Sequence, residues 1–164
     1  MASKRPPALD RIDLKILATL QRDGRMTNQR LAEVVALSPR ASLERVRRLE
    51  AAGIIGGYQA VVELRELTRP VNVFAEIVLE KQANRRRIEK RLTTLDEVVE
   101  CWEVSGNVDY VARFVCADMV VYEELTAELI DDDTLGVARI VSHVALRPVR
   151  RFAGYPESLL RREP

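Results

Sequence analysis

Three short amphipathic segments, separated by helix start and stop signals, constrain the fold of this chain more than any other feature of its sequence. The first predicted helix begins at Asp10 and ends before Gly24, and its apolar residues recur at helical spacing. Thr27 caps a second, short helix. Ser38 caps a third, which starts with a proline and ends at Gly53. Three short helices with a tight connection between the last two are typical of a helix-turn-helix.

The third predicted helix, residues 39–52, has two different faces. On a helical wheel one side is apolar apart from Ser42, whereas the other carries arginines beside small residues. The major groove of DNA admits an α-helix, and arginine binds guanine edges or phosphates there. Residues near the start of such a helix usually meet the bases. The predicted base contacts are Arg40, Ala41 and Glu44, and the predicted phosphate contacts are Arg45, Arg47 and Arg48. A solvated face with a Glu44–Arg48 pair stays open as the alternative.

Charge is distributed unevenly along the chain. Residues 1–60 hold eleven lysines and arginines against six acids, a net charge of +5, whereas the whole chain carries +1. A basic head on an acidic body suits a polyanion-binding module joined to something else, although random scatter gives the same sum. The first nine residues have Lys4 and Arg5 but no apolar run after them, so they are interpreted as a basic arm and not as a secretory signal.

The second part of the chain predicts a βαββαβ order. The predicted elements are a strand at 71–80, a helix at 84–95, strands at 98–105 and 108–117, a helix at 119–130 and a strand at 137–146. This order is typical of a ferredoxin-like antiparallel sheet with helices on one face and a free face for a partner. The predicted domains are a head at 1–60, a linker at 61–70, a second domain at 71–150 and a tail at 151–164; a strand is also expected at 60–62.

Several motifs in this order resemble one known family. They are LDRID at 9–13, LSP at 37–39, LERVRRLE at 43–50, GIIGGY at 53–58, EC at 100–101, VSGNVDY at 104–110 and GV at 136–137. Over residues 9–149 the chain resembles the Lrp/AsnC (leucine-responsive, feast/famine) transcriptional regulators. The resemblance implies an α+β fold: a winged-type helix-turn-helix followed by a βαββαβ ferredoxin-like ligand-sensing and oligomerisation domain.

The resemblance also implies partners and an effector site. The head would bind double-stranded DNA as part of a homodimer, the dimers would assemble into a tetramer or octamer, and an amino acid or related metabolite would bind between dimers. Carried over by position, the effector-binding candidates are Glu103, Ser105, Gly106, Asn107, Val108, Asp109, Tyr110, Met119 and His143. Exposed N–H groups around Gly106 suit a carboxylate, and Asp109 suits an ammonium.

Alternatives stay open at this turn. Asn107 stands where many relatives have Asp, and Glu103 and His143 stand where relatives often carry less ionisable residues, which favours a polar effector or a lost response. A simple hairpin turn stabilised by Asp109 would give the same pattern. Trp102 is interpreted as core or interface and not as a ligand platform.

Other function classes find little support. The sequence shows no catalytic set, phosphate loop or metal cluster, so no enzyme, cofactor or metal site is expected. No apolar stretch is long enough to span a membrane, and Cys101 and Cys116 are expected to be reduced fillers on strands in a cytoplasmic protein. The alternative function is an architectural protein that wraps DNA without a small-molecule response, with Arg85–Arg91 and the cluster of Arg147, Arg150 and Arg151 as its extra surface.

Overall fold

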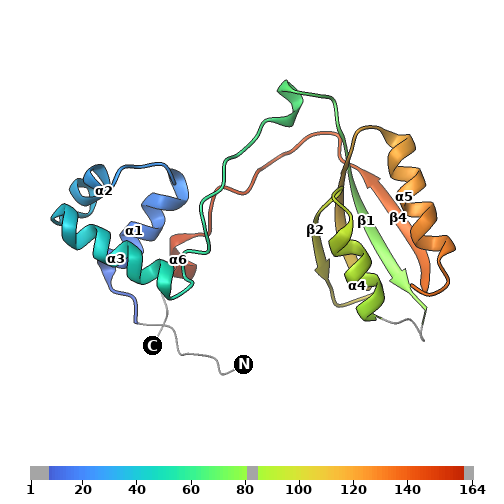
Figure 1. Ribbon diagram of the computed structural model, residues 1–164, viewed down its shortest axis with the longest axis horizontal. Helices are drawn as coiled ribbons and strands as arrows, with labels where there is room; N and C mark the ends of the chain where they lie inside the picture. Colours follow the sequence, from blue (N-terminus) through green and yellow to red (C-terminus); the bar gives the residue numbers. More distant parts are fainter. Residues whose placement is uncertain (1–7, 81–84, 161–164) are drawn as a thin grey trace. The chain divides into compact units, whose positions relative to one another are not determined.

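The computed structural model describes residues 8–80 and 85–160 (Figure 1). The described residues form two compact units: residues 8–61 with 150–160 make up the head, and residues 62–80 with 85–149 make up the second unit. The basic arm before Ala8 and the predicted helix start at Asn84 lie outside the described residues. The predicted α+β class, with helices first and a ferredoxin-like unit after them, is confirmed.

The head contains the three predicted helices: α1 (Arg11–Arg22), α2 (Asn28–Val35) and α3 (Pro39–Ala51). All three predicted N-caps are confirmed, because Asp10, Thr27 and Ser38 each accept a hydrogen bond from a backbone N–H of the first turn. The turn between α2 and α3 places Ala36 in the left-handed region at φ 56°. The N–H of Leu37 then returns to the carbonyl of Ala32 at 2.9 Å, which closes α2 and turns the chain into α3.

The core of the head joins the three helices and the C-terminal segment. Its buried residues are Ile16, Leu17, Leu31, Val35 and Leu49. Leu160, in the short helix α6 (Glu157–Leu160), packs against this cluster. The N–H of Tyr155 donates to Gln21 Oε1 at 2.7 Å, and Arg22 pairs with Glu157 at 3.0 Å. The tail therefore returns to α1 after the second unit is complete.

The expected strand at 60–62 is wrong. Residues 56–63 have no regular structure, and only a single 3-10 turn, η1 (Leu64–Glu66), follows before the sheet. A strand needs a neighbour that satisfies its backbone groups, and no described strand of the chain pairs with this segment. Its apolar side chains consequently face solvent, with Val61 85% exposed.

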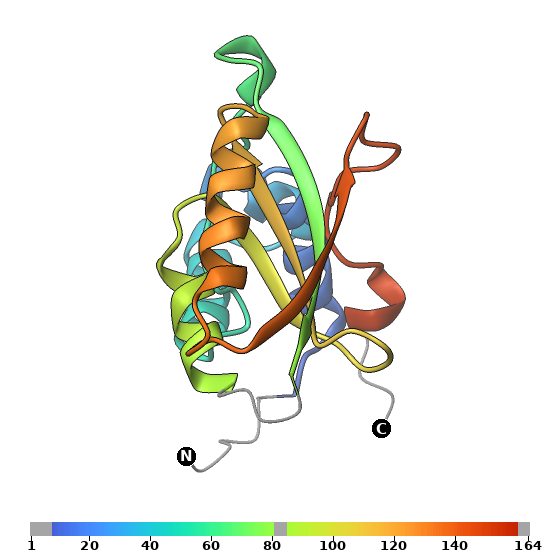
Figure 2. The same ribbon diagram turned by 90° about the vertical axis from the view of Figure 1, so that its right-hand side faces the viewer.

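The second unit is a four-stranded antiparallel sheet. In chain order it contains β1 (Val71–Leu79), α4 (Arg85–Thr94), β2 (Val98–Glu103), β3 (Tyr110–Cys116), α5 (Met119–Asp131) and β4 (Val137–Val144). The strands lie in the order β2-β3-β1-β4 (Figure 2). Ala75 of β1 lies opposite both Ala112 and Ser142. The predicted βαββαβ order is confirmed.

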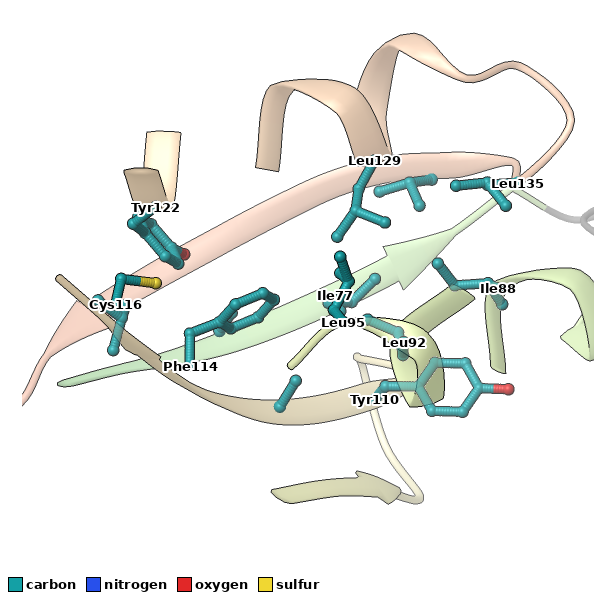
Figure 3. Packing of buried hydrophobic residues seen from close by; sticks show 14 residues of the cluster. Ile77, Ile88, Leu92, Leu95, Tyr110, Phe114, Cys116, Tyr122, Leu129 and Leu135 are labelled. Atoms are coloured by element: carbon teal, nitrogen blue, oxygen red, sulfur yellow. The ribbon is translucent and has the colours of Figure 1, made fainter. Parts of the chain in front are cut away.

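Helices pack against one face of this sheet and leave the other face exposed. Val73, Ala75 and Ile77 of β1 point into a core that α4 and α5 close from one side, with Ile88 and Leu92 among the buried residues (Figure 3). Successive residues of a strand point to opposite faces, so Phe74 and Trp102 lie on the uncovered face, where they are 42% and 67% exposed. Trp102 is thus not a core residue of this chain, which leaves the interface interpretation.

Both cysteines are free and lie on strands as predicted, with Cys116 buried and Cys101 exposed. Cys101 does not fill a core position because β2 is an edge strand whose residues are mostly exposed. No helix within residues 8–80 and 85–160 is long and apolar enough to cross a membrane.

Candidate nucleic-acid interface and effector site

A buried carboxylate on α1 determines which side of α3 faces outward. Asp13 is fully buried, and Arg45 and Arg48 of α3 reach it at 2.9 and 2.6 Å. Arg45 also binds Asp10 at 2.6 Å, while the backbone N–H of Asp10 donates to Asp13 at 3.1 Å. A buried charge is tolerated only when it is paired and hydrogen-bonded, and here the carboxylate has three donors. The result is a polar clamp between the first turn of α1 and the middle of α3.

The clamp also shifts the ionisation of its exposed members. The backbone N–H of Asp13, followed by the guanidinium of Arg45, lowers the pKa of Asp10 below its ordinary value. The same pairing raises the pKa of Arg45, because Asp10 and Asp13 both stabilise its charged form. Asp10 and Arg45 therefore stay charged across the neutral range. Arg45, whose side chain is 25% exposed, is mainly a structural residue, and its phosphate contact stays a prediction.

The remaining candidates of α3 lie on its outward side. Arg40 is 91% exposed and pairs at 3.3 Å with Glu44, so the pair forms one turn earlier than the Glu44–Arg48 pair considered from the sequence. Arg47 is exposed and takes part in no ion pair within the described residues. Ala41 is half-buried and leaves room beside Arg40 for close approach. Arg48 is 49% exposed, so its guanidinium still reaches solvent while it binds Asp13.

The turn between β2 and β3 is organised by Asp109. Its carboxylate accepts a hydrogen bond from the backbone N–H of Leu79 at 2.8 Å and another from Arg85. The Leu79 N–H, and then Arg85, hold the pKa of Asp109 below its ordinary value. Gly106, at φ 122°, adopts a backbone conformation that residues with a side chain rarely adopt. The expected ammonium contact of Asp109 would thus compete with two donors of its own chain.

Arg85, at the start of α4, is the hub of this region. Its guanidinium binds Glu103 at 3.1 Å as well as Asp109, and it lies over the ring of Tyr110 at 5.9 Å from the centroid. The hydroxyl of Tyr110 donates to Glu89 at 2.8 Å. Glu103, Asp109 and Tyr110, three of the predicted effector residues, are therefore held in one network. It borders an exposed turn that contains the further candidates Ser105, Gly106 and Asn107, followed by half-buried Val108.

Two predicted effector residues do not join this network within one chain. Met119 begins α5, which follows the opposite end of β3 from the turn, and it packs against the core of the second unit. His143 lies on the uncovered face of the sheet, where its Nε2 contacts Glu76 at 3.3 Å. A single chain therefore does not bring all nine candidates into one site.

Comparisons with known proteins match both units. Residues 9–55 match a family described as winged helix-turn-helix DNA-binding, and residues 72–154 match the Lrp/AsnC ligand binding domain. The chain belongs to the Lrp/AsnC family of transcriptional regulators. It is 39% identical to the transcriptional regulatory protein DoeX of Halomonas elongata over 145 residues, which cover 87% of this chain and 91% of that one. It is 42% identical to the leucine-responsive regulatory protein of Escherichia coli over 130 residues, covering 77% and 79%.

Solved structures give the same family. A transcriptional regulator of Neisseria meningitidis in complex with L-Met superposes with a TM-score of 0.85 at 29% identity, covering 94% of this chain and all of that one. An AsnC family regulator from Agrobacterium tumefaciens gives 0.84 at 26% identity, covering 93% and 100%. As an Lrp/AsnC protein, the chain is a DNA-binding transcriptional regulator with an effector-binding domain, and its family is one of regulators and not of enzymes.

Sequence reasoning on this Lrp/AsnC chain missed three residues that organise the sites. Asp13 and Arg85 are the centres of the two ion networks, and Asn28 donates to the carbonyl of Pro39 at 2.7 Å, which ties α2 to the start of α3. The signal for Asp13 was present, because an acid three residues after the Asp10 cap forms a capping box. For Arg85 the sequence offered only a run of three arginines, in which one member does not stand out.

Proposed function

We propose that the chain regulates transcription by placing the first half of α3 in the major groove of operator DNA, under the control of an amino acid or related metabolite bound near the β2–β3 turn. The observation that carries the DNA contact is the clamp of Arg45 and Arg48 on buried Asp13. It orients α3 so that Arg40 and Arg47 point away from the head core. Residues 1–60 would act as the DNA-binding domain and 71–150 as the sensor, joined by the linker at 61–70.

The contacts of α3 divide by position. Arg40, Ala41 and Glu44 lie in its first two turns, where recognition helices meet base edges, so we assign them to the bases. Arg47 and the exposed part of Arg48 would bind phosphates. Arg45 would act mainly by holding α3 on α1. The Arg40–Glu44 pair is fully at the surface, so exchanging it for contacts with base edges costs little.

The effector would bind beside the Arg85 network and be enclosed by a second copy of the chain. Amino-acid binding by a relative of the same fold supports this, because the Neisseria meningitidis regulator was solved with L-Met. The exposed N–H groups of the Gly106 turn suit the carboxylate of such a ligand, and Glu103 and Asp109 suit its ammonium. Met119 and His143 would reach the effector only from other copies, as expected of a cytoplasmic homodimer that assembles into a tetramer or octamer.

The DNA contact is tested by selecting preferred duplexes from a randomised library and measuring their affinity by fluorescence anisotropy. Arg40→Ala is expected to relax base preference, at a cost of about 1–3 kcal/mol for the selected duplex. Arg47→Ala is expected to weaken all duplexes alike and to reduce the slope of log K against log salt by about 0.9. Arg69→Ala, at an exposed position of the linker, is the control. If selection returns no preferred sequence, the result contradicts sequence-specific regulation and favours a protein that wraps DNA without reading its sequence.

The effector is tested by a thermal-shift screen against the twenty amino acids and their main catabolites. A compound that binds the folded state raises the melting temperature by mass action. Asp109→Asn should abolish the shift and leave DNA affinity without effector intact, whereas Asp131→Asn, on the exposed surface of α5, should preserve both. An equal shift in wild type and Asp109→Asn would contradict the proposed position of the effector.

A further inference from the structure

Helix α1 carries a second basic surface. Arg11, Lys15 and Arg22 are four and seven residues apart, so they form a row along one side of α1, which we call the α1 basic row. On a helical wheel this row lies opposite Asp13, the residue that faces α3. The row lines a groove together with Val34 of α2 and Leu160 of α6, and no residue of α3 is among its described lining residues. The head therefore has positive charge on two opposite sides.

The charges of this row are poorly neutralised. Arg11 and Lys15 are exposed and take part in no ion pair within residues 8–80 and 85–160. On α3, by contrast, Arg40, Arg45 and Arg48 each bind a carboxylate of the head. Unpaired lysine and arginine side chains keep their full attraction for a polyanion, because no internal partner has to be displaced first.

We propose that the α1 basic row binds the phosphate backbone of a second DNA segment while α3 occupies the first; this rests on the proposed DNA contact of α3. One straight stretch of duplex cannot lie against opposite sides of the same head. From Arg11 to Arg22 the row extends over about 16 Å of helix axis, the length of about five phosphates along one strand. The head would then hold two duplex segments, either separate duplexes or distant parts of one wrapped duplex.

The C-terminal segment competes with phosphate for Arg22, the last residue of this row. Arg22 binds Glu157 of α6 at 3.0 Å, and both side chains are more than half exposed. A phosphate that approaches Arg22 has to displace this carboxylate. Since exposed ion pairs contribute little to stability, Glu157→Gln should free Arg22 without unfolding the segment, and capture of the second duplex should increase.

The experiment measures two affinities of the full chain in parallel. Anisotropy gives the affinity for one labelled duplex, and a bead assay measures how much labelled duplex is captured through protein already bound to an immobilised duplex. The double variant Arg11→Gln/Lys15→Gln should keep single-duplex affinity within about twofold, while capture falls at least several-fold and its salt slope decreases by about 0.9 per lost contact. Arg65→Gln/Arg69→Gln, exposed linker positions that are also four residues apart, is the matched control and should change neither quantity.

The outcomes separate the two proposals. If wild type binds one duplex but the Arg11→Gln/Lys15→Gln variant captures the second as well as wild type does, the second surface is refuted and the DNA contact of α3 stands. The second surface is also refuted if the linker control loses capture equally, because the effect then reflects net charge alone. If wild type binds no single duplex, both proposals fail. Melting temperatures of the variants, expected to equal that of wild type, confirm that folding is unchanged.

Discussion

Removing the buried carboxylate of Asp13 is the most direct perturbation of the head. Asp13 accepts hydrogen bonds from Arg45, from Arg48 and from the N–H of Asp10, at 2.9, 2.6 and 3.1 Å. A hydrogen bond to a charged group contributes about 1.5–3 kcal/mol. The two guanidinium groups are 25% and 49% exposed, so water solvates them again when the carboxylate is gone, and the lower end of this range applies.

For Asp13→Asn, which preserves shape and removes the charge, we therefore expect a loss of about 1.5–2 kcal/mol in the free energy of unfolding of the head. In a unit of this size 1 kcal/mol corresponds to about 4–8 °C, so its melting temperature should fall by at least about 6 °C. Glu33→Gln removes an exposed pair with Arg30 and should change the melting temperature by no more than about 4 °C.

Unfolding of the two units is distinguished by following two spectroscopic signals. Trp102 is the only tryptophan of the chain and lies on β2, so its fluorescence follows unfolding of the second unit. Circular dichroism at 222 nm follows α1, α2 and α3 as well. In Asp13→Asn the dichroism transition should move to lower temperature and the fluorescence transition should not. A shift of less than about 2 °C, or an equal shift in Glu33→Gln, would refute the clamp as the element that holds α3.

Three further predictions concern the turn, the pH dependence and the tail. Gly106→Ala should destabilise the second unit by about 1–3 kcal/mol, measured by the Trp102 transition, because φ 122° is unfavourable for alanine; an unchanged midpoint would contradict this. Asp10 and Asp109 have pKa values held below the ordinary 3.8, so their stabilisation is present above that pH and is lost as the pH falls through the lowered values. Urea midpoints should therefore decrease below about pH 4, and less steeply in Asp109→Asn than in wild type. Leu160→Asp should release the tail from α1, and limited proteolysis at 150–160 that proceeds no faster than in wild type would argue against this contact.

The sequence predicted elements whose signals are local. Caps at Asp10, Thr27 and Ser38 act within one helical turn, and alternation along β1 reports which face is covered, so both follow from neighbouring residues alone. The strand expected at 60–62 has the right composition, but a strand also requires a partner distant in sequence, and the described chain offers none. The local pattern therefore predicted the helices and the strands of the sheet, but it also predicted a strand at 60–62 that has no partner strand in the described chain.

The candidate sites were harder to predict because their chemistry depends on contacts across elements. From the wheel, Arg45 and Arg47 flank the exposed face of α3 and look equivalent. The fold separates them, because Arg45 comes to lie 2.9 Å from a carboxylate 32 residues earlier, whereas Arg47 stays in solvent. The sequence likewise assigned Asp109 to a ligand. Its partners in the fold are the N–H of Leu79 and the guanidinium of Arg85, and neither residue is adjacent to Asp109 in the sequence.

The positive charge of the head consequently overstates what α3 offers to DNA. Five of its basic residues, which the sum of charges along the sequence counts in full, are held by carboxylates: Arg22, Arg30, Arg40, Arg45 and Arg48. A paired guanidinium that binds a phosphate must release or share its partner, so it contributes less to counterion release than an unpaired one. Within the described residues, the unpaired cation of α3 is Arg47, and the unpaired cations of α1 are Arg11 and Lys15. The salt dependence of DNA binding should therefore respond more to Arg47→Ala than to Arg45→Ala, although Arg45→Ala destabilises the fold more. The opposite order would mean that DNA binding opens the clamp on Asp13.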